Sequence, residues 1–208
     1  MSALNIICRA DVKVEDHSLP CIAVDAGLFY CQKHQLKIIT ALGDFDSLDP
    51  DVLSGYTGDL QRVPAEKDQS DLELALDYLR GAEEEIYVYG ALGGRMDHCL
   101  VNLKLCFYTD LNLWLIDEQN RIRCLRPGIH QFPREEGYVS FLGWEACRIS
   151  LTGFKYPLRN YWLKPESNLT LSNEITADLA TVETDNRILI FFTRDRQTGR
   201  AKNENPTL

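Results

Sequence analysis

Along the first 126 residues, segments with the apolar pattern of a β-strand alternate with segments that have the pattern of an α-helix. Short apolar runs typical of β-strands occupy residues 5–8, 21–24, 37–42, 86–89 and 113–116. Helical patterns lie between them, at residues 28–34, 72–79 and 97–108. The second helical segment has a capping box at its start, with Ser70 as the cap and Glu73 three residues later. Strands that alternate with helices predict an α/β fold with a mostly parallel sheet covered by helices.

The pattern changes near residues 126–128 (Arg-Pro-Gly). Beyond that point, strand-like runs follow one another at residues 138–142, 147–151, 161–163, 169–171, 179–182 and 187–192. Turn residues such as Gly143, Asn173 and Asn186 separate these runs, which predicts an all-β sandwich or barrel. We therefore expect an α/β domain over residues 1–126 and a β-sandwich domain over residues 127–208.

Composition narrows the classes of function. Hydrophobic residues make up 45% and charged residues 25%, as in ordinary soluble globular proteins. The net charge of -9 argues against nucleic acid or an anionic membrane as a partner, since both require a positive surface. Phosphate substrates stay open, because a bound divalent cation inverts the local field. No apolar stretch approaches the roughly 18 residues of a membrane span.

The cysteines and the N-terminus indicate a cellular compartment. The chain has 7 cysteines, an odd number, and no Cys-x-x-Cys, so we expect reduced thiols. Neither the cysteines nor the 4 histidines show the spacing of zinc ligands. The first residues lack a basic region followed by a long apolar run, so we expect no signal peptide and a cytoplasmic protein.

Residues with metal- and phosphate-binding chemistry follow three of the predicted strands. Asp25 follows residues 21–24, and residues 43–47 (Gly-Asp-Phe-Asp-Ser) follow residues 37–42. Residues 90–98 (Gly-Ala-Leu-Gly-Gly-Arg-Met-Asp-His) follow residues 86–89. Because ligands of open α/β sheets bind beyond the carboxyl ends of the strands, we expect these segments to share one edge.

Asp44 and Asp46 are two residues apart, so in an extended backbone both side chains would point to the same side. Two carboxylates that converge repel each other unless a proton or a cation intervenes. Mg²⁺ prefers oxygen ligands and often bridges carboxylates to substrate phosphates. The alternative is a solvated turn, in which Asp and Ser serve turn chemistry. Placement after a strand, with Asp25 at another strand end, favours the metal.

The glycine-rich segment 90–94 precedes a helix expected to begin near Asp97. Such a turn lets backbone N–H groups approach phosphate oxygens, and Arg95 adds a planar donor fork. A tight turn with Asp97 as the helix cap explains the same residues, and Asp97 could do both. His98 is more often a packed or supporting residue than a base.

Residues 67–73 (Lys-Asp-Gln-Ser-Asp-Leu-Glu) gather charge at a helix start. Capping and the helix dipole explain Asp71 and Glu73, but they do not explain Lys67 and Asp68. This segment fits a helix cap and a ligand site equally well.

Taken in order, these segments resemble the thiamin pyrophosphokinase family. The resemblance is carried by residues 25–27, 43–48, 67–73 and 93–98, and in the second half by residues 153–158 and 172–174. It spans nearly the whole chain, and its strength lies in six motifs in order. It implies an N-terminal α/β domain and a C-terminal β-sandwich, assembled as a homodimer with the site near the subunit interface.

The resemblance also implies a reaction, in which ATP donates its terminal diphosphate to the hydroxyl of thiamine and AMP is released. The implied Mg²⁺ ligands are Asp25, Asp44, Asp46 and Asp71. The implied ATP and phosphate contacts are Asp25, Gly27, Lys67, Asp68, Gly93, Gly94, Arg95, Asp97 and His98. The implied thiamine contacts are Asp46, Asp71, Ser172 and Asn173, the last two from the neighbouring subunit. Asp46, Asp71 and Arg95 would act in catalysis, with either Asp46 or Asp71 as a general base.

Two positions depart from the family pattern, and two other functions compete. Ala26 replaces a glycine that family members often have, which could hinder a positive φ, and Ser70 replaces a threonine but keeps the hydroxyl. The first competing function is a phosphohydrolase or a kinase for another alcohol. The second is a nucleotide or thiamine sensor without turnover.

Overall fold

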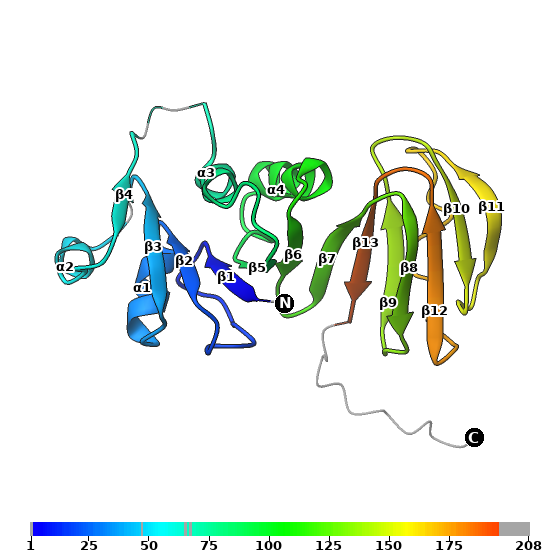
Figure 1. The fold of residues 1–208 in the computed structure, drawn as a ribbon, viewed down its shortest axis with the longest axis horizontal. Helices are drawn as coiled ribbons and strands as arrows, with labels where there is room; N and C mark the ends of the chain where they lie inside the picture. The colour runs from blue at the N-terminus through cyan, green and yellow to red at the C-terminus, as the bar shows by residue number, and fades with distance from the viewer. Residues whose placement is uncertain (1, 47, 65, 67, 196–208) are drawn as a thin grey trace, which may run out of the picture.

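The computed structural model describes residues 2–46, 48–64, 66 and 68–195. Its main feature is a nine-stranded sheet with the order β4-β3-β2-β1-β5-β6-β7-β13-β9 (Figure 1). The strands are β1 (Ala3–Ile7), β2 (Cys21–Val24), β3 (Ile38–Gly43), β4 (Leu60–Arg62), β5 (Glu85–Tyr89), β6 (Asn112–Ile116), β7 (Asn120–Leu125), β9 (Tyr138–Leu142) and β13 (Ile188–Thr193). Neighbouring strands are parallel from β4 to β6 and antiparallel from β6 to β9.

Helices cover both faces of the parallel part. They are α1 (Gly27–Lys33), α2 (Pro50–Ser54), α3 (Asp71–Tyr78) and α4 (Met96–Tyr108). Leu72 and Leu76 of α3 and Phe107 of α4 join one apolar cluster with alternate residues of the central strands. Leu28 of α1 joins a second cluster with Ile7, on the other face of the sheet. This arrangement confirms the predicted α/β fold, in which α3 and α4 lie together and α1 lies across the sheet from them (Figure 1).

A four-stranded antiparallel sheet packs against the far end of the large one. Its order is β11-β10-β12-β8, with β8 (Gly128–Pro133), β10 (Cys147–Thr152), β11 (Leu158–Leu163) and β12 (Leu179–Thr184). Phe141 and Ile190 of the large sheet share a buried cluster with Ile149 and Val182 of the small one. The two sheets form the predicted all-β sandwich.

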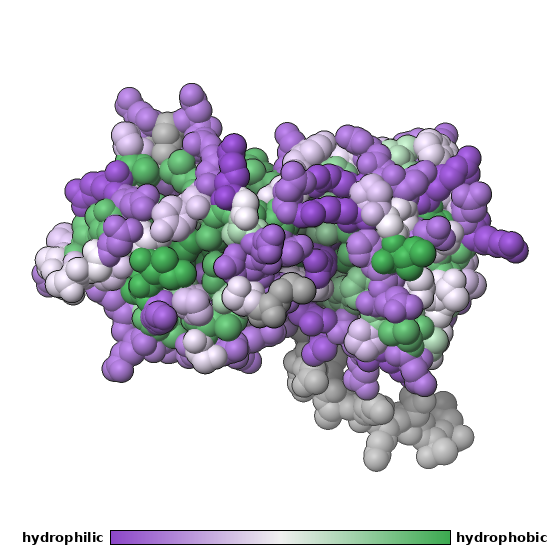
Figure 2. All heavy atoms as spheres, in the orientation of Figure 1, coloured by the Kyte–Doolittle hydropathy of each residue, from purple (hydrophilic) through white to green (hydrophobic). Residues whose placement is uncertain are grey.

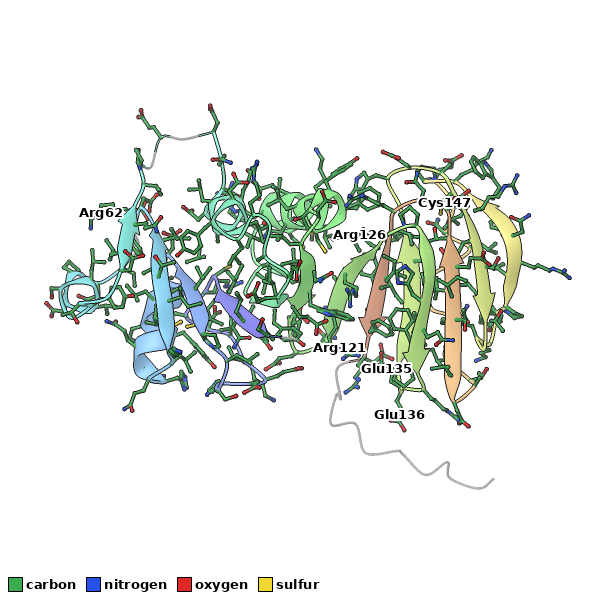
Figure 3. The ribbon with its side chains drawn as sticks, in the orientation of Figure 1. Arg62, Arg121, Arg126, Glu135, Glu136 and Cys147 are labelled. Atoms are coloured by element: carbon green, nitrogen blue, oxygen red, sulfur yellow. The ribbon has the colours of Figure 1, made fainter. Side chains whose placement is uncertain are left out.

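The large sheet runs without a break through both halves of the chain. β13, from the second half, pairs with β7, from the first half, along its whole length. Arg121 of β7 also forms an ion pair with Glu135, which follows β8; both side chains lie near the middle of the molecule (Figure 3). The division at residue 126 therefore stays a prediction, and a shared sheet joins its two sides.

The sequence pattern missed some elements and misplaced one. The strands β4, β7 and β8 and the short helix α2 were not predicted. Residues 169–171 were predicted as a strand, but they form a turn. Leu169 and Leu171 are exposed, whereas Thr170 is buried and its hydroxyl donates to the carbonyl oxygen of Phe141 at 2.6 Å. Burial does alternate along residues 169–171, but the polar Thr170 faces the core and the two leucines face solvent. The predicted strand was therefore wrong.

The surface seen in Figure 2 is hydrophilic over much of both halves, with apolar residues between the polar ones. No helix among the described residues is long and apolar enough to cross a membrane.

Candidate active site

The predicted acidic residues gather where parallel strands end. Asp25 follows β2, Asp44 follows β3, and Asp71 is the first residue of α3. Ser70 caps that helix, since its hydroxyl oxygen accepts from the backbone N–H of Glu73 at 3.2 Å. The predicted cap at Ser70 is confirmed, and it fixes the place at which Asp71 enters the site.

Asp25 is held in a strained conformation by its surroundings. Its φ is 44°, in the left-handed region, and its Oδ1 accepts from the backbone N–H of Phe45 at 3.3 Å. Gly43 leaves the space that this carboxylate occupies, because a Cβ there would lie 1.8 Å from Oδ1 of Asp25. Ala26 has a φ of -58°, so this position needs no glycine and the departure from the family pattern is harmless.

Asp25, Asp71 and Asp44 interact electrostatically. The pKa of Asp25 is raised to about 7, first by burial, then by a hydrogen bond to Asp71 and the charge of Asp71, with a smaller effect of Asp44. The bond from Phe45 acts in the opposite direction. A divalent cation would relieve this repulsion between carboxylates, so the donor set fits a hard cation such as Mg²⁺.

These three carboxylates form only part of a metal site. Among the residues that the structure describes, no group of three or more His, Cys, Asp or Glu side chains is arranged to hold a metal ion by itself. Mg²⁺ usually keeps several waters and takes further oxygens from substrate phosphates. Asp25, Asp44 and Asp71 would therefore hold such an ion together with the phosphates.

The backbone around Asp44 and Asp46 differs from the sequence-based expectation. Phe45 between them has a φ of 59°, so the segment is not extended and the spacing rule does not apply. Oδ1 of Asp44 accepts from the backbone N–H of Asp46 at 3.1 Å, which is the turn chemistry of the alternative interpretation. Asp44 is half-buried and Asp46 is exposed. The metal role of this pair stays a prediction, but the premise of parallel side chains was wrong.

The glycine-rich loop follows β5 and leads into α4. Gly90, Gly93 and Gly94 have φ values of 85°, 77° and 69°, which side chains rarely allow. Arg95 forms an exposed ion pair with Asp97, in which NH2 lies 2.6 Å from Oδ2 and Nε lies 3.2 Å from Oδ1. Arg95 accordingly holds the pKa of Asp97 at about 2.

The predicted cap at the start of α4 was wrong. The helix begins at Met96 and its N-cap is Arg95, without a side-chain cap. Asp97 lies inside the first turn, where its Oδ1 accepts from the backbone N–H of His98 at 3.0 Å. Both side chains are exposed beside the loop, so Asp97 is available to ligand or solvent and His98 is not packed.

Two other predicted contacts, Gly27 and Asp68, have simpler surroundings. Gly27 is buried at the start of α1, where a Cβ would lie 1.8 Å from the carbonyl oxygen of Ile7. This close approach of α1 to β1 is a packing reason for the glycine. Asp68 is exposed before α3, and Lys67 lies outside the described residues.

Ser172 and Asn173 lie at the other end of the molecule. Asn173 forms a bridge with Val139 in β9. Seven strand-to-strand steps separate β3 from β9, which is roughly 34 Å at about 4.8 Å per step. In Figure 1, β3 and β9 lie in opposite halves of the molecule. One chain therefore does not bring these residues together with Asp44.

Asn173 is also committed to the local structure. It is buried, its Oδ1 accepts from the backbone N–H groups of Tyr156 at 3.0 Å and Glu174 at 2.9 Å, and its Nδ2 donates to the carbonyl oxygen of Tyr156 at 2.8 Å. The neighbouring Ser172 is exposed and has a φ of 55°. Asn173 thus holds two loops together, and Ser172 is the residue open to a ligand.

The structure adds residues that sequence reasoning missed. Arg9 and Asp11 follow β1 and lie at the same edge as Asp25 and the glycine loop. Cys8 is half-buried near the acidic residues, and desolvation and then the charges of Asp25 and Asp71 raise its pKa to about 12. The strand-end rule that found Asp25 would have found Arg9 as well, had it been applied to the first predicted strand.

Known families match both halves of this chain. Residues 13–115 match the family described as thiamin pyrophosphokinase, catalytic domain. Residues 129–189 match the family described as thiamin pyrophosphokinase, vitamin B1 binding domain. The thiamine pyrophosphokinase of Bacillus subtilis (strain 168) is 35% identical over 199 residues, which cover 90% of this chain and 92% of that protein.

Solved structures agree with the fold. The structure of thiamine pyrophosphokinase from Bacillus subtilis superposes with a TM-score of 0.83 at 29% identity and covers 93% of this chain and 100% of its own. The thiamin pyrophosphokinase of Geobacillus thermodenitrificans gives 0.81 at 28% identity, with coverage of 95% and 99%. The thiamin pyrophosphokinase from Candida albicans, at 16% identity and a TM-score of 0.78, covers 93% of this chain and 90% of its own and shares the fold.

Proposed function

Because this chain belongs to the thiamin pyrophosphokinase family, we propose that it transfers the terminal diphosphate of ATP to the hydroxyl of thiamine. The products are thiamine diphosphate and AMP, and the reaction requires Mg²⁺. The observation that supports the metal requirement is the group of Asp25, Asp71 and Asp44, in which burial first and then the neighbouring carboxylates raise the pKa of Asp25 to about 7.

The residues at the strand ends have different roles in the diphosphate transfer. Asp25, Asp44 and Asp71 would hold Mg²⁺, which would neutralise phosphate charge. Arg95 and the backbone N–H groups of the glycine loop bind phosphate oxygens and stabilise the charge that develops during transfer. Diphosphoryl transfer depends mainly on such positioning and charge neutralisation.

The acceptor is a cation with a hydroxyl group, and the acidic site suits both features. Thiamine carries a positive thiazolium ring, which the carboxylates attract. The hydroxyl oxygen of thiamine attacks the β-phosphorus, the bond from that phosphorus to the oxygen shared with the α-phosphate breaks, and AMP leaves. Asp46 or Asp71 accepts the hydroxyl proton.

We place the thiamine contacts of Ser172 and Asn173 in a second copy of the chain. The support is the roughly 34 Å between β3 and β9 across seven strand steps of one sheet. A homodimer that brings the sandwich of one chain to the strand ends of another would complete each site.

A product assay tests this function. ATP, Mg²⁺ and purified protein are incubated with and without thiamine, and nucleotides are separated by chromatography. We expect AMP and thiamine diphosphate in equal amounts, and only when thiamine is present. ADP as the product, or free phosphate without thiamine, would point to a kinase or a phosphohydrolase. Binding of both substrates without turnover would point to a sensor.

A further inference from the structure

The large sheet reverses its strand order between β1 and β5. From β1 the order continues through β2, β3 and β4 on one side, and through β5 and β6 on the other. Open α/β sheets bind ligands in the crevice at such a switch point, beyond the carboxyl ends of the strands. The two strand ends are joined here, because the backbone N–H of Cys8 donates to the carbonyl oxygen of Tyr89 at 2.9 Å. The next residues, Arg9 and Gly90, therefore meet at the crevice.

The glycine loop is shaped around the side chain of Arg9. A Cβ on Gly90 would lie 3.0 Å from Cβ of Arg9, and a Cβ on Gly94 would lie 3.1 Å from Nη1 of Arg9. Both glycines have positive φ, so two separate constraints keep side chains away from this arginine. The guanidinium thus lies beside the same loop amides that are expected to bind phosphate.

Arg9 is held in the same way as Arg95. Its Nε lies 2.9 Å from Oδ1 of Asp11, and its Nη2 lies 2.7 Å from Oδ2. Each arginine is thus paired through two hydrogen bonds with an aspartate two residues further along the chain. The Arg9 side chain keeps 40% of its surface exposed, so a ligand can reach it.

A cavity opens beside this pair. It has a volume of about 200 Å³, and its charged lining consists of Arg9 and Lys13 together with Asp11, Asp117 and Glu118. It lies at the ends of β1, β5 and β6, next to the glycine loop. A polyphosphate on the loop amides would have this cavity and the Arg9 guanidinium at its side.

We propose that Arg9 binds the phosphate chain of the nucleotide, as a second guanidinium beside the glycine loop in addition to Arg95. This inference rests on the proposed function, since it assigns a further contact to the ATP site. The planar fork of arginine matches phosphate oxygens with two parallel hydrogen bonds. Asp11 keeps the fork oriented before the nucleotide arrives.

Direct binding measurements test this role without turnover. Isothermal titration calorimetry compares the wild-type protein with Arg9→Ala, using Mg-ATP and then Mg-tripolyphosphate, which has no base or sugar. We expect Arg9→Ala to raise the Kd of both probes by about tenfold or more, because a charge-assisted hydrogen bond is lost. Arg9→Lys, which keeps the charge but loses the fork, should weaken binding less than Arg9→Ala and still measurably.

Arg80→Ala is the matched control. Arg80 also pairs with an aspartate, Asp77, at 2.6 Å, but it lies beyond the far end of α3. This variant should bind both probes like the wild-type protein. If circular dichroism shows that Arg9→Ala is unfolded, the Kd values of Arg9→Lys for both probes are compared with those of the wild-type protein instead.

Failure of this inference differs from failure of the proposed function. Unchanged Kd values in the Arg9 variants, in a protein that forms AMP with thiamine, would overturn the role of Arg9 alone. A weakened affinity for ATP with unchanged affinity for tripolyphosphate would also overturn it, because the contact would then be with the nucleoside. A wild-type protein that binds neither probe would overturn both.

Discussion

At the scale of single residues, the proposed site depends on a few carboxylates that are close together and partly buried. Asp25 is the residue whose surroundings show this directly, since burial and the neighbours Asp71 and Asp44 raise its pKa. A group of this kind at strand ends is typical of a functional site.

Asp44→Asn should abolish turnover while the protein stays folded. Loss of one negative oxygen weakens the metal site, and we expect kcat to fall by at least about a hundredfold. Steady-state kinetics with ATP and thiamine measure this, and circular dichroism checks the fold. Asp59→Asn, an exposed aspartate before β4, is the control and should leave the rate unchanged. Near-normal activity of Asp44→Asn would show that the metal lies elsewhere.

The raised pKa of Asp25 predicts how the stability of the protein depends on pH. Its folded-state pKa of about 7 lies above the ordinary value of 3.8, so its stabilising contribution is complete below about pH 4 and is lost as pH rises through 7. Without Mg²⁺, the melting temperature should therefore fall between pH 5 and pH 8 more steeply in the wild-type protein than in Asp25→Asn. Thermal unfolding in a metal chelator measures both slopes, and equal slopes would contradict the raised pKa.

At the scale of elements, the ends of β2, β3 and β5 and the starts of α3 and α4 position the site. Their conformations depend on residues with a clear steric role. Gly43 is the clearest case, because a Cβ there would collide with Asp25.

Gly43→Ala should displace Asp25 and reduce both stability and activity. We expect a loss of about 1–3 kcal/mol in the free energy of unfolding, as is usual when a side chain is forced into a packed space. Chemical denaturation and steady-state kinetics measure the two effects. Gly55→Ala is a suitable control, since Gly55 has a φ of -76° that alanine adopts easily. A Gly43→Ala protein that is as stable and active as Gly55→Ala would be incompatible with the close approach of the Asp25 carboxylate to Gly43.

Ser70→Ala should cost about 1 kcal/mol through loss of the helix cap. Because Asp71 is the next residue, activity should fall together with stability. Ser70→Thr keeps the hydroxyl and should restore both. Thermal unfolding and initial rates of the three proteins check this, and an alanine variant equal to the threonine variant would exclude a role for the cap.

The element scale also shows how much the sequence can predict. Periodicity located α3 and α4 to within a residue at their starts, because their apolar faces are buried against the sheet. It missed β7, in which only Ile122 and Leu125 are buried, since a strand with this pattern is recognisable only by its partners. The same limit applies to Asp44 and Asp46, whose turn depends on the positive φ of Phe45.

At the scale of the whole molecule, the long shared sheet separates the acidic site from Ser172 and Asn173 in one chain. Sequence order could place each motif on its element, but it could not show that β13 returns to pair with β7 and joins the two halves. Such pairing links residues that are distant in the chain, and local patterns of apolar and polar residues do not predict it. The proposed thiamine site therefore needs residues from two chains.

Mixing two inactive variants tests the shared site. Asp44→Asn damages the strand-end half of the site, and Ser172→Arg, which places a bulky side chain at the exposed position, damages the sandwich half. Random pairing of the two proteins would give mixed dimers with one intact site each, and about a quarter of wild-type activity in an equal mixture. Activity is measured after the subunits have been allowed to exchange. A mixture no more active than its components would place both halves of the site in one chain.

Transfer of a diphosphate from ATP to thiamine is tested most directly by the fate of the β-phosphate. ATP labelled with ³²P at the β-position is incubated with the protein, Mg²⁺ and thiamine, and the labelled products are separated. We predict that the label leaves the nucleotide and appears in thiamine diphosphate, whereas label at the α-position stays in AMP. Retention of the β-label in ADP would contradict diphosphate transfer.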